Sequence, residues 1–503
     1  MVKGGPLVVV GDSLLDVDIE GTAGRLAPDA PVPVVDCQRE RHRAGGAGLA
    51  AILASGQPGP GVVLITALAD DPQGARLRAL LDRHVEVLPV PLRGGTPCKI
   101  RVTASGQPLV RLDAGDGRAA PGPVDAAVDR VLRQAGAILV ADYGRGLTAH
   151  LGLRARLAEL PAGIPVVWDP HPRGQPPVPG IRLATPSQAE ARSLAAALPA
   201  QADQPPPRDP LGQAAHDAAG LGRAWGAAVA VTLGRHGALL STGDDVPFLA
   251  PPPEGPAAGL PDTCGAGDCF AATAAQVLRG GGLLTEAVTE AVRRACEFVG
   301  LGGASAVPGR TIPSGTGPSG TGSHNERLRP AEDAWGVAAH VKDHGGRVVA
   351  TGGCFDLLHA GHVQLLRQAR RLGDALIVCL NSDSSVRALK GPGRPLVGAA
   401  DRARVLTALE CVDAVLVFDE PTPSAVLGRL RPDLWVKGSD YTQAGLAEVA
   451  VVRGYGGEVM LLPYTGRHST SQIMAAAAAV SSEWVPGPAA VLGSEVLGGG
   501  TQG

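Results

Sequence analysis

Short apolar runs alternate with Ala-, Leu- and Arg-rich stretches along most of the chain. The apolar runs are continuous, are bounded by Gly, Pro or Asp, and are clearest at 8–10, 137–140, 166–168 and 228–232. Runs of this length are typical of strands buried on both faces, and strands that alternate with helices are typical of parallel sheets. The pattern therefore predicts an α/β protein with largely parallel sheets.

The alternation is interrupted most clearly at 308–330, PGRTIPSGTGPSGTGSHNERLRP, where apolar residues are almost absent. A segment of Gly, Ser, Thr and Pro can bury little surface and is typical of a flexible linker. A second Pro-rich stretch at 198–211 is interpreted as a surface-loop insertion. We predict a first domain at 1–307, a linker at 308–334, a second domain at 335–484 and a Gly/Pro-rich disordered tail at 485–503.

Length and composition agree with this division. A chain of 503 residues predicts about two to four domains, and 45% hydrophobic with 18% charged residues is typical of a globular protein. A net charge of -3 and 3% aromatic residues argue against nucleic acid or an anionic membrane as a partner. The first apolar run is too short for a signal peptide or a membrane span, and the eight cysteines show no metal-binding spacing. We expect a cytoplasmic protein with reduced cysteines.

The segment 262–270, DTCGAGDCF, precedes an Ala-rich helical run in the first domain. Small residues at Gly265, Ala266 and Gly267 let the backbone approach a ligand, and the N–H groups that begin a helix bind anions. Asp268 then stands where a carboxylate can take a proton from a hydroxyl that attacks a phosphate, which is worth about 10²–10⁴ in rate. The alternative is an ordinary Gly-rich turn capped by Asp.

Other segments support the phosphoryl-transfer interpretation. A turn with Thr232, Gly234 and Gly237 follows an apolar strand and suits the approach of a nucleotide. The first strand leads into Gly11–Asp16 with two carboxylates, and Gly45 and Gly46 lie where a helix begins. Together these segments resemble the ribokinase-type carbohydrate kinase family over residues 7–307. The segments 25–34, 99–102, 109–113 and 141–146 resemble the heptose 7-phosphate kinase branch of that family most closely.

The resemblance implies roles for individual residues. It implies that Asp268 is the catalytic base, Gly265–Gly267 the anion hole, Glu190 the carboxylate that organises Mg²⁺, and Asp16, Gly45, Gly46, Lys99 and Arg111 contacts to the sugar phosphate. The chain also departs from the family pattern. Leu49 and Ser187 replace Asn, and Arg145 and His171 replace Lys, so that a polar sugar contact is expected to be lost at Leu49.

The second domain contains the segment 348–362, VVATGGCFDLLHAGH, in which a predicted strand leads through a turn into a helix. His359 and His362 are three residues apart at the helix start and can point toward phosphates held at its positive end, while Gly361 permits close approach. Such histidines can stabilise charge on a transferring phosphate. A zinc pair would need further ligands and the HExxH arrangement, and a surface helix with two unrelated histidines is the other alternative.

Further polar segments follow the HxGH tetrapeptide: 380–383, 387–395, 401–402, 433–441 and 467–471. The chain has 40 Arg and only five Lys, and two of those lysines, Lys390 and Lys437, fall in these segments. The set resembles the cytidylyltransferase-like nucleotidyltransferases over 347–474, and most closely the heptose 1-phosphate adenylyltransferase branch. It implies that His359, His362 and Lys390 are catalytic, that Thr351, Gly352, Phe355, Gly361, Arg394, Lys437, Ser469, Thr470 and Ser471 bind nucleotide or phosphate, and that Asp356 and Asp383 contact substrate.

The pairing of the two domains resembles bifunctional kinase/adenylyltransferases of ADP-heptose synthesis. We expect a ribokinase-like α/β domain followed by a smaller Rossmann-like nucleotidyltransferase domain, with ATP and Mg²⁺ as cofactors, a homodimer, and a separate phosphatase acting between the two reactions. Three alternatives remain open: another sugar phosphate or CTP as substrate, an active transferase beside a structural kinase half, and a nucleotide-sensing scaffold.

Overall fold

The computed structural model describes residues 4–56, 61–161, 163–199, 209–243, 246–253, 263–306, 333–439 and 448–463. The chain divides into two compact units, one within Met1–Arg327 and Arg431–Pro463 and the other within Leu328–Leu430 and Tyr464–Gly503. The predicted linker at 308–334 and the predicted tail at 485–503 lie almost wholly outside the described residues. The domain boundaries drawn from the sequence therefore stay predictions.

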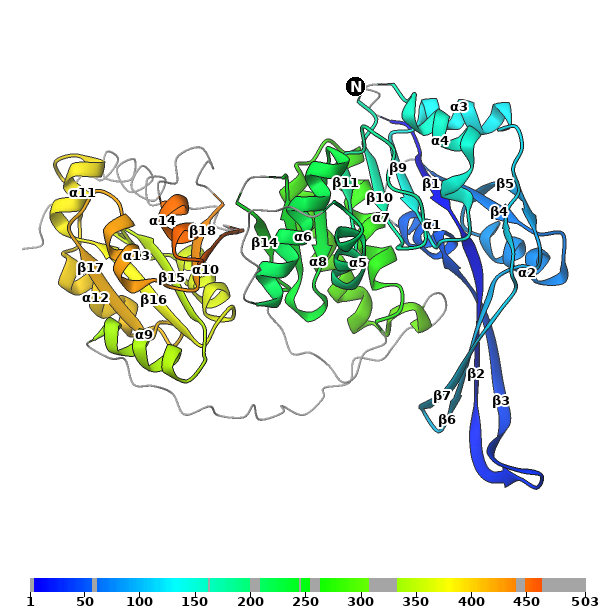
Figure 1. Cartoon of the computed structure of the whole chain (residues 1–503), viewed down its shortest axis with the longest axis horizontal. Coiled ribbons are helices and arrows are strands. Elements are labelled where there is room, and N and C mark those ends of the chain that lie inside the picture. Colours follow the sequence, from blue (N-terminus) through cyan, green and yellow to red (C-terminus); the bar gives the residue numbers. More distant parts are fainter. Residues whose placement is uncertain are drawn as a thin grey trace, which may run out of the picture. The chain divides into compact units, whose positions relative to one another are not determined.

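The strands of the first unit form a long sheet and a smaller separate one (Figure 1). The strands are β1 (Leu7–Gly11), β2 (Ser13–Ala27), β3 (Ala30–Gly46), β4 (Val62–Leu68), β5 (Glu86–Arg93), β6 (Cys98–Ala104), β7 (Gln107–Ala114), β8 (Arg118–Ala119), β9 (Ala137–Ala141), β10 (Val166–Asp169), β11 (Leu183–Ala184), β12 (Ala228–Thr232), β13 (Ala238–Ser241), β14 (Phe248–Ala250), β18 (Leu434–Gly438) and β19 (Glu458–Leu462). The helices are α1 (Ala47–Ser55), α2 (Pro72–Leu81), α3 (Ala126–Gln134), η1 (Leu147–Ala149), α4 (Leu151–Ala158), α5 (Gln188–Ala196), α6 (Pro210–Trp225), η2 (Gly234–His236), α7 (Ala266–Arg279), α8 (Leu284–Gly300), η3 (Gly303–Ala306) and α14 (Glu448–Gly454).

The main sheet runs in the order β13-β12-β11-β10-β9-β1-β4-β5, and its strands are parallel from β12 to β5. All residues of β1 and β9 are buried, as their continuous apolar sequence predicts. Helix α7 packs against α1, α8, β9 and β10. Its N-terminus lies at the carboxyl edge of this sheet, because Asp268 in its first turn accepts a hydrogen bond from Tyr143, two residues after the end of β9. Ligands bind at this edge in open α/β sheets, and here it carries the predicted kinase residues.

The smaller sheet, in the order β3-β2-β6-β7, was not predicted from the sequence. The long β2–β3 hairpin and the β6–β7 hairpin beside it project from the main sheet (Figure 1). Asp16 and Lys99, for which the resemblance implies contacts to the sugar phosphate, are directly opposite each other on β2 and β6. The strands therefore carry residues that were predicted to contact the sugar phosphate and that the apolar pattern alone did not place.

The second unit contains a parallel sheet in the order β17-β16-β15 with helices packed on it. Its elements are α9 (Ala334–Asp343), β15 (Val348–Gly353), α10 (Ala360–Arg370), β16 (Ala375–Asn381), α11 (Asp383–Lys390), α12 (Ala399–Thr407), β17 (Ala414–Phe418) and α13 (Ser424–Leu430). The whole of β16 is buried. The predicted strand, turn and helix around the HxGH tetrapeptide are therefore present, with α10 beginning one residue after His359.

Candidate active sites

The first candidate site lies at the N-terminus of α7. Gly265 caps the helix with a φ of 82°, and a Cβ there would come within 2.7 Å of the Leu49 side chain. A Cβ on Gly267 would meet no described atom within 4 Å, so the space in front of the turn is open. The left-handed φ at residue 265 favours glycine, and the open space at residue 267 leaves room for an anion near the helix N–H groups.

Asp268 is buried in the first turn of α7 and accepts a hydrogen bond of 2.7 Å from the Tyr143 hydroxyl. Burial raises the pKa of Asp268 to about 7, while the Tyr143 hydrogen bond and the charge of Lys99 oppose the shift. A carboxyl with a pKa near neutral pH is matched to general-base catalysis. The geometry therefore agrees with the role that the resemblance implied for Asp268.

Asp12 organises the loop that carries Tyr143. Its buried carboxylate accepts backbone hydrogen bonds from Tyr143 (3.3 Å), Arg145 (2.9 Å) and Leu147 (3.1 Å). Sequence reasoning noted the 141–146 segment but did not assign Tyr143 or Asp12 to the site. The signal that could have found them is the Asp-Tyr pair that directly follows the buried strand β9.

The substrate-side residues lie on the smaller sheet. Asp16 is 3% exposed and pairs with Arg101 at 2.9 Å and with Arg43 at 3.4 Å. A Cβ on Gly45 would lie 2.5 Å from an Asp16 carboxylate oxygen, so the absence of a side chain at Gly45 makes room for Asp16. The Lys99 ammonium lies 5.3 Å from the centre of the Tyr143 ring. The two arginines were missed because an isolated Arg has no distinguishing sequence pattern.

Arg111 lies farther along this sheet, on the edge strand β7. Its side chain is 57% exposed and pairs with Asp113 at 2.6 Å. Gly46, in contrast, adopts a φ of 61° beside Asp12 and Tyr143, where the chain passes from β3 into α1. Gly46 is therefore part of the turn that borders the site, and the predicted substrate contact of Arg111 stays a prediction.

Two further carboxylates belong to the same edge of the main sheet. Asp169 ends β10, and burial together with the charges of Glu190 and Asp268 raises its pKa well above the usual value. Glu190 accepts hydrogen bonds from the backbone (2.9 Å) and hydroxyl (2.7 Å) of Ser187, forming a capping box at the start of α5. Ser187, which replaces the family's Asn, therefore has a structural role here.

The predicted nucleotide turn adjoins this capping box. Thr232 forms a β-bridge with Ser187, and its N–H donates to the Pro186 carbonyl at 3.0 Å. Gly234 has a φ of 58°, and a Cβ on Gly237 would lie 2.0 Å from the Ala250 carbonyl oxygen. The structure therefore brings the turn beside the Glu190 segment, although 40 residues separate them.

Leu49, which replaces the family's Asn and was expected only to lose a polar sugar contact, has a packing role. It is 3% exposed and forms a hydrophobic core with Cys269, Phe298 and Ala304. These residues lie under the anion-binding turn, and Leu49 contacts the space where a side chain at residue 265 would project. Leu49 therefore supports the turn by packing.

The second candidate site lies at the N-terminus of α10. His359 is the N-cap residue, and its ring stacks on the ring of His362 with 3.9 Å between centroids. The Phe355 ring lies 5.2 Å from that of His362, and Phe355 adopts a left-handed φ of 44°. Burial lowers the pKa of His362 to about 4, helped by the nearby His359 and Lys390. Both imidazoles therefore lie together, and His362 is neutral at physiological pH.

Other predicted residues surround this helix start. Thr351 and Gly352 lie at the carboxyl end of β15, where Thr351 is 1% exposed, and Gly361 is buried in the first turn of α10. Lys390 is exposed in the last turn of α11. It is close enough for its charge to lower the pKa of His362.

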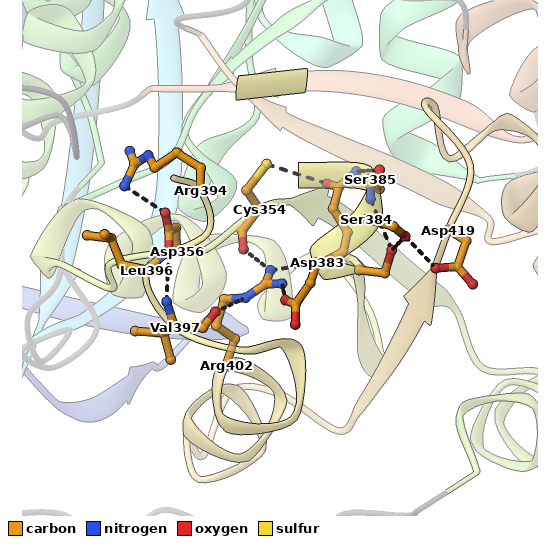
Figure 2. A network of polar contacts seen from close by, with 12 residues as sticks. Cys354, Asp356, Asp383, Ser384, Ser385, Arg394, Leu396, Val397, Arg402 and Asp419 are labelled. Atoms are coloured by element: carbon orange, nitrogen blue, oxygen red, sulfur yellow. Dashed lines mark hydrogen bonds and ion pairs between the residues drawn. The ribbon is translucent and has the colours of Figure 1, made fainter. Parts of the chain in front are cut away.

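Asp356 is tied to the loop that follows α11 (Figure 2). Its buried carboxylate pairs with Arg394 at 2.6 Å and accepts hydrogen bonds from the N–H groups of Leu396 (2.7 Å) and Val397 (3.2 Å). Asp356 and Arg394 were predicted to contact substrate and phosphate separately. In this structure they contact each other.

Arg402 was quoted in the sequence analysis but given no role. It is 2% exposed, and its guanidinium donates to the carbonyls of Cys354, Asn381 and Val397 and to the Asp383 carboxylate (Figure 2). Arg402 could not be recognised as such a hub from spacing, because its four acceptors come from three separate segments of the chain, at 354, 381–383 and 397.

Lys437 and the segment 469–471 were also predicted to bind phosphate. Lys437 lies on β18 in the first compact unit, is 6% exposed and pairs with Glu448 at 3.8 Å. Ser469, Thr470 and Ser471 lie outside the described residues. The phosphate contacts predicted for these four residues stay predictions.

The described residues contain no group of three or more His, Cys, Asp or Glu side chains arranged to hold a metal ion. They also contain no helix that is long and apolar enough to span a membrane.

Two family profiles match the chain. Residues 6–309 match the pfkB family carbohydrate kinases, and residues 350–475 match the family described as cytidylyltransferase-like. The order of the two matches agrees with the predicted order of a ribokinase-like domain and a smaller nucleotidyltransferase domain.

Full-length relatives share both parts. The bifunctional protein HldE of Streptomyces coelicolor is 52% identical over 478 residues, which are 94% of this chain and 96% of the relative. HldE of Azorhizobium caulinodans is 36% identical over 482 residues, which are 94% of this chain and 98% of the relative. Among solved structures, Arabidopsis thaliana ribokinase complexed with ribose and ATP matches 60% of this chain and 94% of its own, with 23% identity and a TM-score of 0.47.

Proposed function

This chain belongs to the family of the bifunctional proteins HldE, and from that premise we propose that it is a two-site enzyme of ADP-heptose synthesis. The first site phosphorylates heptose 7-phosphate at C1 with ATP. The second site transfers AMP from ATP to heptose 1-phosphate and releases pyrophosphate. One observation carries the proposal: a single chain has a buried carboxylate with a pKa near 7 at one helix N-terminus and, at another, a stacked histidine pair in which the pKa of His362 is lowered to about 4.

In the kinase reaction, Asp268 accepts the proton of the C1 hydroxyl as its oxygen attacks the γ-phosphorus of ATP. The bond between the γ-phosphorus and the bridging oxygen breaks, and ADP leaves. The open turn at Gly265–Gly267 binds the transferring phosphoryl group with backbone N–H groups. Tyr143 orients the Asp268 carboxylate through its hydroxyl.

In the transferase reaction, a phosphate oxygen of heptose 1-phosphate attacks the α-phosphorus of ATP. The bond to the β-phosphate breaks, and pyrophosphate leaves. His359 and His362 donate hydrogen bonds to the charge that develops there, and imidazoles can do so without a covalent intermediate. Lys390 and Arg394 neutralise phosphate charge.

Mg²⁺ fits the donors at the kinase site. Asp169 and Glu190 are close enough for the charge of Glu190 to raise the pKa of Asp169, and Mg²⁺ binds to one or two carboxylates together with substrate phosphates. We propose that these two residues hold it, directly or through water. When bound, the ion screens the phosphate charge of ATP.

The further partners are part of the same proposal. We propose a homodimer formed through the smaller sheet, because Val110 and Leu112 on the edge strand β7 are 49% and 51% exposed. We also propose a cytoplasmic location and a separate phosphatase that removes the 7-phosphate between the two reactions. The first domain, at 1–307, and the second, at 335–484, would then each carry one activity.

A ³¹P NMR assay on the full-length protein tests the proposal. The protein is supplied with ATP, Mg²⁺ and heptose 7-phosphate, with and without a 7-phosphatase. We expect the 1,7-bisphosphate first, and pyrophosphate with ADP-heptose only after the phosphatase is added. Adenylylation of supplied heptose 1-phosphate without any bisphosphate would limit the function to the transferase, and the absence of both reactions would refute the heptose assignment.

A further inference from the structure

One buried arginine joins the segments that border the transferase site. Arg402 lies on α12, and its Nε donates to the Val397 carbonyl at 2.8 Å. One terminal nitrogen donates to the carbonyls of Cys354 and Asn381, the latter at 2.9 Å. The other donates to the Asp383 carboxylate at 2.7 Å (Figure 2). Arg402 therefore connects the ends of β15 and β16, the start of α11 and the loop before α12.

This arrangement needs a guanidinium and no other cation. The Arg402 side chain is 1% exposed, and a buried charge is costly unless it is paired and its donors are satisfied. Here the planar fork meets three carbonyls and one carboxylate that lie in different directions. A lysine ammonium is a compact point charge and cannot reach all four acceptors at once.

The anchored atoms lie next to the groups that would react. Cys354 is two residues before Asp356 and five before His359. The Val397 carbonyl accepts a hydrogen bond from Arg402, and the Val397 N–H donates one to Asp356. Arg402 and Asp356 therefore both fix the position of Val397. The Asp383 carboxylate is 43% exposed, and Arg402 fixes the orientation of this exposed group.

We propose that Arg402 is a positioning residue for nucleotidyl transfer, a proposal that rests on the transferase function proposed above. It contacts no substrate itself. It holds the Cys354 and Val397 backbone near Asp356, together with the Asp383 carboxylate, in the geometry that the reacting phosphates require. Because small displacements of reacting groups lower the rate steeply, its effect should appear in kcat more than in KM.

The test replaces Arg402 with Lys in the full-length protein and measures pyrophosphate release from ATP and heptose 1-phosphate. We expect kcat to fall about 100-fold, and KM for both substrates to change less than about threefold. Arg404→Lys is the matched control, because Arg404 lies on the same helix but is 82% exposed. The kinase activity of the same preparations should equal that of the wild type.

A double-mutant cycle separates positioning from a general loss of structure. Asp383→Ala removes the exposed end of the network, and we expect it to lower kcat in the wild-type background but to add little in the Arg402→Lys background. Thermal unfolding of each variant is followed in parallel. If Arg402→Lys does not fold, Asp383→Ala alone decides: a kcat at least about tenfold lower supports the proposal, and a wild-type kcat overturns it.

Two other outcomes would overturn the inference. One is a folded Arg402→Lys variant with wild-type kcat, and the other is losses in the double variant that are fully additive. A wild-type protein that releases no pyrophosphate would instead refute the transferase function itself, so the two failures are distinguishable.

Discussion

Burial acts on a carboxyl in one unit of this protein and on an imidazole in the other, and the two pKa shifts have opposite signs. The pKa of Asp268 rises to about 7, and the pKa of His362 falls to about 4. In both cases a low-dielectric environment disfavours the charged form. The results differ chemically: Asp268 can gain or lose a proton near neutral pH, whereas His362 stays neutral. Proton abstraction from a sugar hydroxyl needs the first property, and hydrogen bonding to a transferring phosphate needs only the second.

The largest effect is expected for the Asp268→Asn variant. Asparagine keeps the shape but cannot accept the proton, so we expect kinase activity to fall by about 10²–10⁴ with the transferase unchanged. The measurement is ADP formation with heptose 7-phosphate beside pyrophosphate release with heptose 1-phosphate. Asp129→Asn, at a half-buried carboxylate of α3 that pairs with Arg133, is the control. Equal losses in both activities would contradict separate sites.

The converse change is His362→Ala. Loss of a preorganised donor to the developing charge should lower transferase kcat by about 10²–10³, while the kinase rate is unchanged. Pyrophosphate release measures the effect. His340→Ala, an exposed histidine on α9 in the same unit, should leave both activities as in the wild type. A transferase with normal kcat would remove His362 from the mechanism.

A third prediction concerns the core under the kinase turn. Leu49→Asn restores the residue that the kinase family usually has, but here it buries an amide against Cys269 and Phe298. We expect a loss of about 2–4 kcal/mol in the free energy of unfolding of the kinase unit. Urea denaturation followed by residual kinase activity measures it. Leu151→Asn, at a side chain that is 83% exposed, should have little effect. An unchanged urea midpoint for Leu49→Asn would contradict the packing role.

The smallest expected effect is a shift in the pH dependence of the kinase reaction. The kinase kcat/KM should decline as pH falls through about 7, because Asp268 becomes protonated there. Tyr143→Phe removes the hydrogen bond that lowers this pKa, so the declining limb should move to higher pH. The measurement is kcat/KM from pH 5.5 to 9. The transferase profile should not move, and a kinase profile that is the same in both proteins would refute the link between Tyr143 and Asp268.

Much of the fold followed from local pattern, but the candidate sites followed only in part. The buried strands near 8–10 and 137–140 were predicted because a strand covered on both faces must be continuously apolar. The projecting β2–β3 hairpin was missed, because much of it is exposed and its charged residues show no simple alternation. Arg402 was missed as a site residue for a different reason, since its four acceptors are distributed between residues 354 and 397.

The two reaction types could be predicted from the sequence, because each is marked by a short contiguous segment at the start of a helix. Gly265–Asp268 and His359–His362 left alternatives open when taken alone, and their resemblance to the two families, together with the other matching segments, predicted a kinase and a nucleotidyltransferase. The pKa values of the site residues, in contrast, depend on the tertiary structure. The pKa of Asp268 depends on burial and on Tyr143, which is 125 residues away in the chain. Burial and long-range pairing are properties of the packed chain, and no local segment specifies them.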